Sequence, residues 1–418
     1  MHRQGWTVCV LGILLSGSVL ISLSANVLSA DAVGGAFNAG SSRPRRVGTG
    51  ARGFRGHISR EELQRRRHGV AALASRSPHW ATDCDGMMQQ QPPLPPAPDD
   101  ALSFITIGDW GVFGLDVGSD AQLAVSRGMA CVARKHPPRF IASLGDNFYP
   151  NGVTSVDDAQ FEAKFEAVYH DASLHVPWYP SLGDHDHCGD VGAQAAYSRV
   201  STRWTMPRAW YTRYVKIAGG QGGTMQLVVV DWVALEGSFT RAPGDRRFHD
   251  KLSAAAGPEA AVAHWEWLRE VTRRGNPTWR VVVGHRPLIS ASARGARDDV
   301  QYPAEAAARR AIRDFMESVG VDLWVNGHDH TAQVACSVVK DGSQSNKVTH
   351  FMTNGVGGYD LHALRAQSEW SQETQYANNT YHGFAVHRVT KDSIATYFLD
   401  DKGDVQHDFV IRRTRTTC

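Results

Sequence analysis

From about residue 99 onward, short apolar runs alternate with longer stretches of helical sequence. The pattern predicts strands at 103–107, 140–144, 178–182, 280–283 and 321–326, and helices near 119–135, 157–169, 259–273 and 304–318. A β-rich run lies at 225–232, and residues 350–412 contain several short strands with turns at 357–358 and 401–403. Alternating strands and helices followed by a β-rich tail predict a layered α/β fold.

The first 30 residues differ from this pattern. A short basic start at Arg3, an apolar run over 8–28 and a small-residue site at 28–30 are typical of a secretory signal peptide. The apolar run is long for a signal, so an uncleaved membrane anchor is the competing interpretation. No second apolar run approaches membrane-spanning length, so only this segment is expected to span a membrane.

Residues 31–98 are rich in Arg, Gly and Ser and end in Gln-rich and Pro-rich sequence. Such a composition buries little apolar surface, so we expect a flexible basic linker or pro-region. It is either a solvated tail or a segment that contacts acidic lipid or glycan. The main folded domain is therefore predicted over 99–412, with a short tail at 413–418.

Composition and charge narrow the functional classes. Hydrophobic residues make up 42% and charged residues 21% of the chain, as in ordinary soluble globular proteins. The net charge of +2 predicts no nucleic-acid partner. The sequon at 378–380 (Asn-Asn-Thr) is consistent with secretion and glycosylation.

The cysteine count bears on possible disulfides. A secreted chain favours disulfides. Removal of the signal with Cys9 leaves an odd number, so at least one lies outside an intramolecular pair. The five that remain are Cys84, Cys131, Cys188, Cys336 and Cys418.

Five predicted strands end in side chains that can bind metals, and each of these ends begins with a glycine. Open α/β folds gather ligands at the carboxyl ends of their strands. One such turn says little, but five in series predict one shared metal site. The residues are Asp109, Asp146 with Tyr149, Asp184 with His185, His285, and His328 with His330.

The residue types and spacing suggest two metal ions. In the Gly-His-Asp-His sequence at 327–330, alternate residues of an extended segment point the same way. His328 and His330 can then reach neighbouring ions about 3.5–4 Å apart, with Asp146 as the natural bridge. The phenolate of Tyr149 is a hard anionic ligand that suits trivalent iron. Two Lewis acids of this kind generate a hydroxide nucleophile at acidic to neutral pH.

The ordered sequences GDWG, GDNFY, GDHDH, VVGHRP and GHDH resemble the metallophosphoesterase superfamily. Tyr149 points to the purple acid phosphatases, and GDWG with GDNFY to their tartrate-resistant acid phosphatase branch. The similarity covers roughly residues 101–412. It implies a calcineurin-like four-layer αββα sandwich with a binuclear metal site at one edge.

The resemblance also implies roles for individual residues and an activity. A ferric ion would be held by Asp109, Asp146, Tyr149 and His330, and a divalent iron, zinc or manganese by Asp146, Asp184, His285 and His328. His185 would contact the substrate phosphate and help to protonate the leaving alkoxide. The implied activity is that of an acid phosphatase that hydrolyses phosphomonoesters by attack of a metal-activated hydroxide.

The chain departs from the family pattern at two positions. Asp184 stands where the family has asparagine, and Arg294 stands where this branch has a second active-site histidine. Aspartate is a capable ligand, and arginine is a good phosphate clamp. Arg286 and Arg294 are therefore candidate phosphate contacts beside His185.

The sequence is also compatible with two alternatives to an acid phosphatase. One is a catalytically weakened phosphatase fold that serves as a scaffold or anchor, and the other is a phosphodiesterase of the same superfamily. The metal-capable side chains favour the enzyme, and Tyr149 weighs against the phosphodiesterase. Trp110 is predicted to pack beside the site. The remaining histidines, such as His350, His362, His387 and His407, are predicted to be structural or on the surface.

Overall fold

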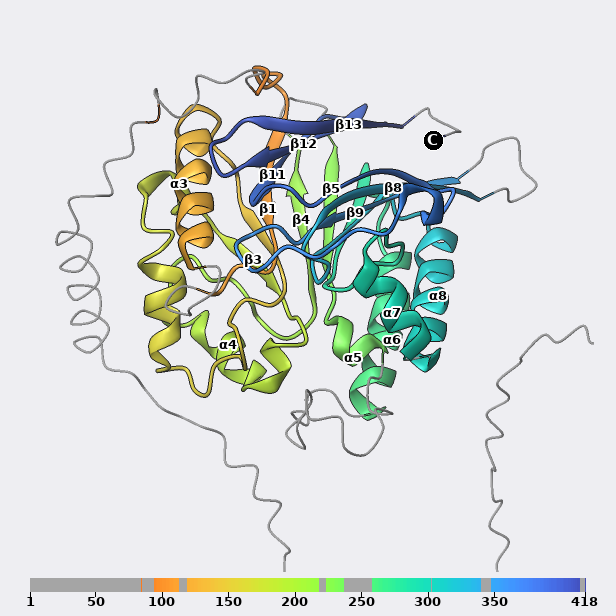
Figure 1. Ribbon diagram of the computed structural model, residues 1–418, viewed down its shortest axis with the longest axis horizontal. Coiled ribbons are helices and arrows are strands. Elements are labelled where there is room, and N and C mark those ends of the chain that lie inside the picture. The colour runs from red at the N-terminus through yellow and green to blue at the C-terminus, as the bar shows by residue number, and fades with distance from the viewer. Residues whose placement is uncertain are drawn as a thin grey trace, which may run out of the picture. The chain divides into compact units, whose positions relative to one another are not determined.

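The computed structural model describes residues 84, 94–112, 119–217, 223–236, 258–301, 303–339, 347–413 and 418 (Figure 1). These residues form two mixed β-sheets with helices. The predicted signal segment at 1–30, and all of the predicted linker except Cys84 and residues 94–98, lie outside the described part. No helix among the described residues is both long and apolar enough to cross a bilayer.

The first sheet has the strand order β13-β12-β11-β1-β2-β3. Its first three strands in the sequence pair in parallel, and Ile141 lies between Ile105 and Trp178 in the register. The later strands join antiparallel to one edge of β1. The strands are β1 (Leu102–Ile107), β2 (Ile141–Leu144), β3 (Trp178–Ser181), β11 (Gly383–Val389), β12 (Ser393–Asp400) and β13 (Val405–Arg412).

The second sheet has the order β10-β8-β9-β7-β6-β5-β4. The neighbours β5, β6, β7 and β9 pair in parallel, and antiparallel strands flank them on both sides. The strands are β4 (Tyr211–Lys216), β5 (Thr224–Val229), β6 (Trp279–Val283), β7 (Leu323–Asn326), β8 (Ala332–Val339), β9 (Lys347–Asn354) and β10 (Thr374–Asn378).

Alternation along β6 shows how the layers stack. Val281 and Val283 belong to the large apolar cluster that includes side chains of the first sheet. Val282, on the opposite face of the strand, packs with Leu268 and Ile312 in a second cluster. Full burial of such an aliphatic side chain stabilises the fold by about 1.5–3 kcal/mol. The second sheet is therefore apolar on both faces, between the first sheet and a layer of helices.

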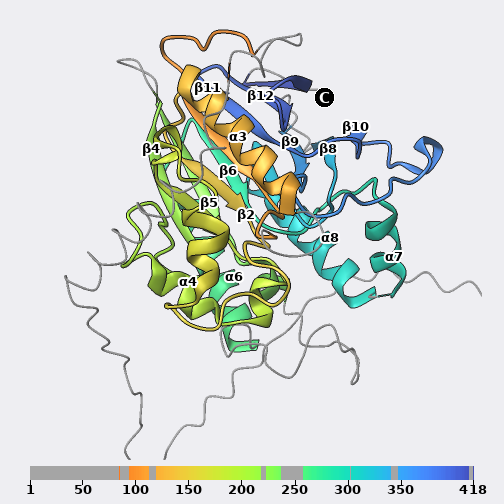
Figure 2. The same cartoon turned by 60° about the vertical axis from the view of Figure 1, so that its left-hand side comes forward.

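The helices complete a four-layer αββα arrangement, as predicted. The helices α5 (Trp232–Glu236), α6 (Pro258–Arg273), α7 (Ala293–Gln301) and α8 (Pro303–Ser318) lie on the side of the second sheet, and α3 (Ser119–Lys135) lies on the side of the first (Figures 1 and 2). A Cβ at Gly128 would lie 2.4 Å from the carbonyl oxygen of Asp401, so α3 sits directly on the turn between β12 and β13. The short helical elements are α4 (Val191–Tyr197) and the 3-10 turns Ala172–Leu174, Asp186–Cys188 and Gln367–Glu369.

Most predicted elements are confirmed, including the helices at 119–135, 259–273 and 304–318. The helix predicted over 157–169 is instead a short π-helix at Phe161–Glu166. It buries Phe161 and Phe165 and turns Lys164 inward, where Nζ donates to the carbonyl oxygen of Tyr149 at 2.5 Å. The strand predicted at 225–232 ends at Val229, and helix α5 begins at Trp232.

Two disulfides join distant parts of the described chain. Cys84 is bonded to Cys131 in α3, and Cys336 in β8 is bonded to the terminal residue Cys418. Cys188 takes part in neither disulfide, in keeping with the predicted odd cysteine. Leu94 is buried in the main core, so packing reaches upstream of the predicted domain boundary at residue 99.

Several aromatic and histidine side chains have the structural roles predicted for them. Trp110 is fully buried, and its Nε1–H donates to Oγ of Ser143 at 2.7 Å. His387 and His350 are buried, and His407 stacks on Tyr376 with ring centroids 3.8 Å apart.

Candidate metal centre

Five loops bring the predicted ligands together at one edge of the paired sheets. The loops that follow β1, β2 and β3 leave adjacent parallel strands, as do the loops that follow β6 and β7. The carboxyl ends of parallel strands meet at one edge of a sheet. Side chains far apart in the sequence therefore come within hydrogen-bonding distance, and nearly all of them are buried.

The backbone of these loops is unusual at three ligand positions. Asp109, Asp146 and His328 have φ values of 60°, 49° and 68°, in the left-handed region that non-glycine residues rarely adopt. The backbone N–H of His328 donates to Oδ2 of Asp109 at 2.9 Å, which links the loops after β7 and β1. Strained positions of this kind often cluster at functional sites.

The left-handed turn at His328 corrects the extended geometry expected for the Gly-His-Asp-His sequence. Residues 328–331 form a bend, and His328 and His330 do not alternate as in a strand. Both rings still reach the site, but through different nitrogens. His328 presents Nδ1, and His330 presents Nε2. A Cβ at Gly327 would lie 2.3 Å from Oδ2 of Asp109, so only glycine fits in front of His328.

One group of ligand atoms surrounds the phenol of Tyr149. Its hydroxyl lies 3.0 Å from Oδ1 of Asp109, 3.0 Å from Oδ2 of Asp146 and 3.2 Å from Nε2 of His330. These four side chains come from the loops after β1, β2 and β7. They are the four residues predicted for the ferric ion, and the structure brings them together.

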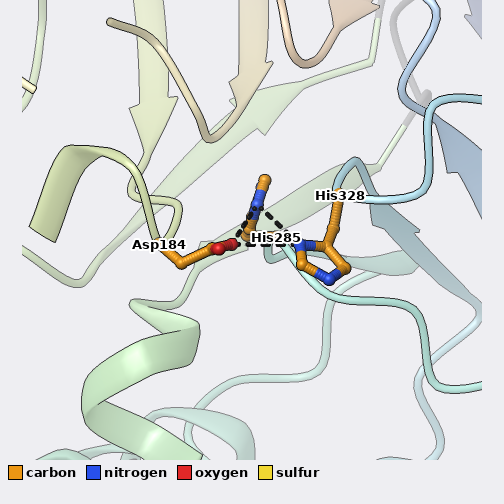
Figure 3. Close-up of side chains that lie close together, drawn as sticks. All are labelled: Asp184, His285 and His328. Atoms are coloured by element: carbon orange, nitrogen blue, oxygen red, sulfur yellow. Dashed lines mark hydrogen bonds and ion pairs between the residues drawn. The ribbon is translucent and has the colours of Figure 1, made fainter. Parts of the chain in front are cut away.

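A second group lies beside the first and is shown in Figure 3. Oδ1 of Asp184 lies 3.0 Å from both Nε2 of His285 and Nδ1 of His328, and the two ring nitrogens are 3.3 Å apart. The ligand atoms of these three residues all lie within 4.8 Å of one another, which is close enough for one ion.

Asp146 connects the two groups. Oδ2 of Asp146 lies 3.3 Å from Nε2 of His285 as well as 3.0 Å from the Tyr149 hydroxyl. Its other oxygen, Oδ1, accepts the backbone N–H of His185 at 2.9 Å. The carboxylate therefore has a fixed orientation between the two groups, as the predicted bridge requires.

The electrostatics of the cluster favour bound cations. Burial raises the pKa of Tyr149 well above its usual range, and the charges of Asp109 and Asp146 raise it further. Burial also raises the pKa of Asp184, but the neighbouring His328 and Arg286 outweigh it and lower that pKa well below its usual range. Three carboxylates and a phenol are buried together here, and such a group is costly without opposite charge. This donor set therefore fits metal ions.

Outer hydrogen bonds orient the ligand rings. Nδ1 of His285 faces the carbonyl oxygen of Leu144 at 2.9 Å, and Nδ1 of His330 faces that of Asp360 at 2.5 Å. Each contact fixes the tautomer so that Nε2 keeps its lone pair for the site. Nε2 of His328, the nitrogen on the far side of the ring, lies 3.7 Å from Oδ2 of Asp298.

His185 is half-buried beside the ligand groups. Its Nδ1 faces the carbonyl oxygen of Pro150 at 2.6 Å, and its ring lies 4.5 Å from the Tyr149 ring between centroids. The Pro150 carbonyl thus occupies Nδ1, and Nε2 is the ring nitrogen that can exchange a proton with another group.

The two candidate phosphate contacts have different settings. Arg286 is only 3% exposed, and its Nη1 lies 2.5 Å from Glu305 and 3.6 Å from Glu236. Its Nη2 lies 4.0 Å from Oδ2 of Asp184. This setting corrects the expectation of a phosphate clamp, because the guanidinium is already surrounded by buried carboxylates. The Arg294 side chain is 28% exposed and lies beside the site.

Sequence reasoning missed two residues at the site. His362, predicted to be structural or on the surface, stacks on His330 with ring centroids 3.9 Å apart. Asp186 is fully buried and accepts the backbone N–H groups of Asn147 and Gly183, which ties the loops after β2 and β3 together. Asp186 carried a signal, since it lies inside the Gly-Asp-His-Asp-His sequence. His362 follows no predicted strand and carried none.

Comparisons with known proteins show the family to which the chain is related. Residues 102–332 match the family model described as calcineurin-like phosphoesterase. Purple acid phosphatase 4 of Arabidopsis thaliana is 29% identical over 315 residues, which cover 75% of this chain and 84% of that protein. Tartrate-resistant acid phosphatase type 5 of Mus musculus is 31% identical over 273 residues, which cover 65% and 77%.

Solved structures support the same fold. The GAP50 anchor in the inner membrane complex of Plasmodium has a TM-score of 0.58 at 20% identity and covers 76% of this chain and 91% of its own. The purple acid phosphatase PPD1 from yellow lupin seeds has a TM-score of 0.50 at 14% identity and covers 77% and 55%. At these identities the likeness concerns the fold alone.

Proposed function

We propose that this chain, which belongs to the purple acid phosphatases of the calcineurin-like phosphoesterase family, hydrolyses phosphomonoesters at a binuclear Fe(III)–M(II) centre. The observation that carries the proposal is the position of the Tyr149 hydroxyl, within 3.2 Å of Asp109, Asp146 and His330. A phenol among hard anionic ligands is a donor set for ferric iron.

Each ion has its own set of residues. Asp109, Asp146, Tyr149 and His330 would hold the ferric ion, and Asp146, Asp184, His285 and His328 a divalent iron, zinc or manganese. When bound, the two ions supply Lewis acidity and an activated water at neutral or acidic pH.

The chain's own residues orient the substrate and move a proton. Arg294 reaches the rim and would bind a phosphate oxygen, because guanidinium groups suit phosphate. Nε2 of His185 would contact the phosphate and deliver a proton to the leaving alkoxide oxygen. The Pro150 carbonyl, 2.6 Å from Nδ1, keeps the ring turned for that transfer.

The activity can be tested with two substrates. The purified protein, loaded with iron and then with zinc or manganese, should hydrolyse p-nitrophenyl phosphate and turn over bis-p-nitrophenyl phosphate far more slowly. Metal analysis should give two ions per chain. Metal-loaded protein that hydrolyses neither ester would contradict the proposal, and a preference for the diester would identify a phosphodiesterase.

Colour provides a prediction specific to Tyr149. A phenolate bound to ferric iron gives a charge-transfer band, so the iron-loaded protein should be purple or pink. Tyr149→Phe should remove the visible band because no phenolate oxygen remains. The matched control is Tyr359→Phe, since Tyr359 stacks on Tyr149 with ring centroids 4.3 Å apart. An iron-loaded, active and colourless wild type would exclude Tyr149 as a ligand.

We also propose that the chain enters the secretory pathway and works in a secreted or lysosome-like compartment. The Cys84–Cys131 and Cys336–Cys418 disulfides support this proposal, because disulfides persist in oxidising compartments. The expected substrates are small phosphomonoesters or phosphoproteins. A membrane contact is expected only if residues 1–30 stay attached.

A further inference from the structure

Two short backbone segments place Arg294 and His362 side by side. The N–H of Ala293 donates to the carbonyl oxygen of Ala363 at 2.8 Å, and the N–H of Arg365 donates to that of Ala291 at 3.0 Å. This pairing joins the start of α7 to the loop before β10. As a result, Nη1 of Arg294 lies 3.4 Å from Nε2 of His362.

His362 is held firmly against the ligand residue His330. The two rings stack at an interplanar angle of 15°. The backbone N–H of His362 donates to the carbonyl oxygen of His330 at 3.0 Å, and the backbone N–H of His330 donates to Nδ1 of His362 at 3.1 Å. The position of Nε2 is therefore fixed relative to the first ligand group.

Arg294 is linked to the second group. Its Nε lies 3.7 Å from Oδ2 of Asp298, and the same oxygen lies 3.7 Å from Nε2 of His328. The pair formed by Arg294 and His362 thus lies beside both groups of ligands, and the Arg294 side chain is partly open to solvent.

The two contacts of the His362 ring are in conflict. A neutral imidazole has one lone pair and one N–H, yet both ring nitrogens face donors, the His330 amide and the Arg294 guanidinium. The shorter contact, to a backbone amide that needs a partner, takes the lone pair on Nδ1. Nε2 then carries hydrogen and faces the Arg294 donor. Two converging donors are satisfied by one acceptor placed between them.

We propose that His362 and Arg294 together bind one oxygen of the substrate phosphate, with the Nε2–H of His362 and the guanidinium of Arg294 as the two donors. The inference rests on the proposed phosphatase function, which supplies an anion at this place. His362 thereby becomes a substrate-binding residue. It contributes a second donor next to Arg294, and the pair forms a site for one anionic oxygen.

Phosphate binding tests the pair without relying on turnover. Inorganic phosphate would be titrated calorimetrically into the metal-loaded protein and into His362→Asn and Arg294→Gln. In His362→Asn the amide oxygen can still accept the His330 N–H, while no donor remains at the Nε2 position. Each substitution should weaken phosphate binding by about tenfold or more, because hydrogen bonds to a charged group are lost. The double variant should lose less than the product of the two, since both donors act on one oxygen.

Controls separate this role from a structural one. Metal content and the visible band should be unchanged in His362→Asn, and Arg297→Gln, an exposed arginine on the same helix, should leave phosphate affinity within about twofold, as expected for a surface charge. His362→Asn could instead bind less metal and, once its metal content is restored to that of wild type, bind phosphate with wild-type affinity. That result would show that His362 only supports His330, and the proposal would be wrong.

Phosphate binding and ester hydrolysis, measured together, distinguish failure of the Arg294–His362 site from failure of the phosphatase activity. Normal hydrolysis of p-nitrophenyl phosphate with unchanged phosphate affinity in both variants would reject the Arg294–His362 site and leave the phosphatase intact. A wild type that binds phosphate through this pair but hydrolyses no ester would support the inference and reject the activity. A metal-loaded wild type that binds no phosphate would overturn both.

Discussion

Asp146→Asn is expected to prevent metal loading and to lower phosphatase turnover by roughly a thousandfold or more. Asparagine keeps an oxygen that can accept the His185 N–H, but an NH₂ group replaces the oxygen that lies 3.0 Å from the Tyr149 hydroxyl and 3.3 Å from His285. An NH₂ group cannot bridge two cations. Lewis acidity contributes several kcal/mol to such reactions, which corresponds to a factor of this size.

The design separates chemistry from folding. Asparagine tolerates the left-handed φ of 49° at this position, so the loop is not strained further. In metal-free protein the variant is expected to be less stable than wild type, because burial raises the pKa of Asp146 but the charge of His285 outweighs it and lowers that pKa, so the ionised carboxylate stabilises the fold. Asp314→Asn, on the exposed side of α8, is the control and should keep two metals per chain. An Asp146→Asn protein with two bound metals and activity within tenfold of wild type would exclude Asp146 as the bridge.

Arg286→Met should lower the free energy of unfolding of the metal-free protein by about 3–5 kcal/mol, the usual cost of removing one partner from a buried ion pair. The side chains of Arg286, Glu236 and Glu305 are 4%, 1% and 6% exposed. Methionine fills much of the volume but leaves these two glutamates and Asp184 without the guanidinium. Urea denaturation measured at equilibrium gives the value.

Two comparisons identify the cause of the loss. Adding Glu305→Gln to Arg286→Met should recover part of the stability, because one uncompensated carboxylate is removed. Arg274→Met removes an arginine whose side chain is 71% exposed from a surface pair with Glu270, and it should cost less than about 1 kcal/mol. Metal loading should reduce the Arg286→Met penalty, since a cation beside Asp184 supplies positive charge. If Arg286→Met unfolds with the wild-type free energy, the buried network does not stabilise the fold.

The pair of Arg286 and Asp184 gives a physical reason for the departure from the family's asparagine. An aspartate at this position adds a negative charge to the second ligand group. A buried guanidinium 4.0 Å from its Oδ2 opposes that charge and helps to lower the pKa of Asp184. Asp184 therefore stays ionised, with Oδ1 directed at His285 and His328.

Much of the fold and of the candidate metal centre could be predicted from the sequence. The apolar runs located β1, β2, β3, β6 and β7, and the structure brings together the polar residues that follow them, from Asp109 to His330. This succeeded because the signals are local. A buried strand needs consecutive apolar residues, and a parallel sheet brings the ends of its strands to one edge. The ligand groups around Tyr149 and Asp184 follow from that geometry.

The tertiary structure decided which side chains lie around those ligands. Glu236, Arg286 and Glu305 come from separate helices and loops, and nothing in their local sequence predicts that their charges meet in the core. His362 reaches the site only because residues 290–293 pair with residues 363–365. The left-handed turn at His328 likewise depends on Asp109. Asp109 follows β1 of the first sheet, and its carboxylate accepts the backbone N–H of His328, which follows β7 of the second sheet. Periodicity along the chain determines which face of an element is buried, whereas contacts between distant segments depend on how the layers pack, and that information is not local.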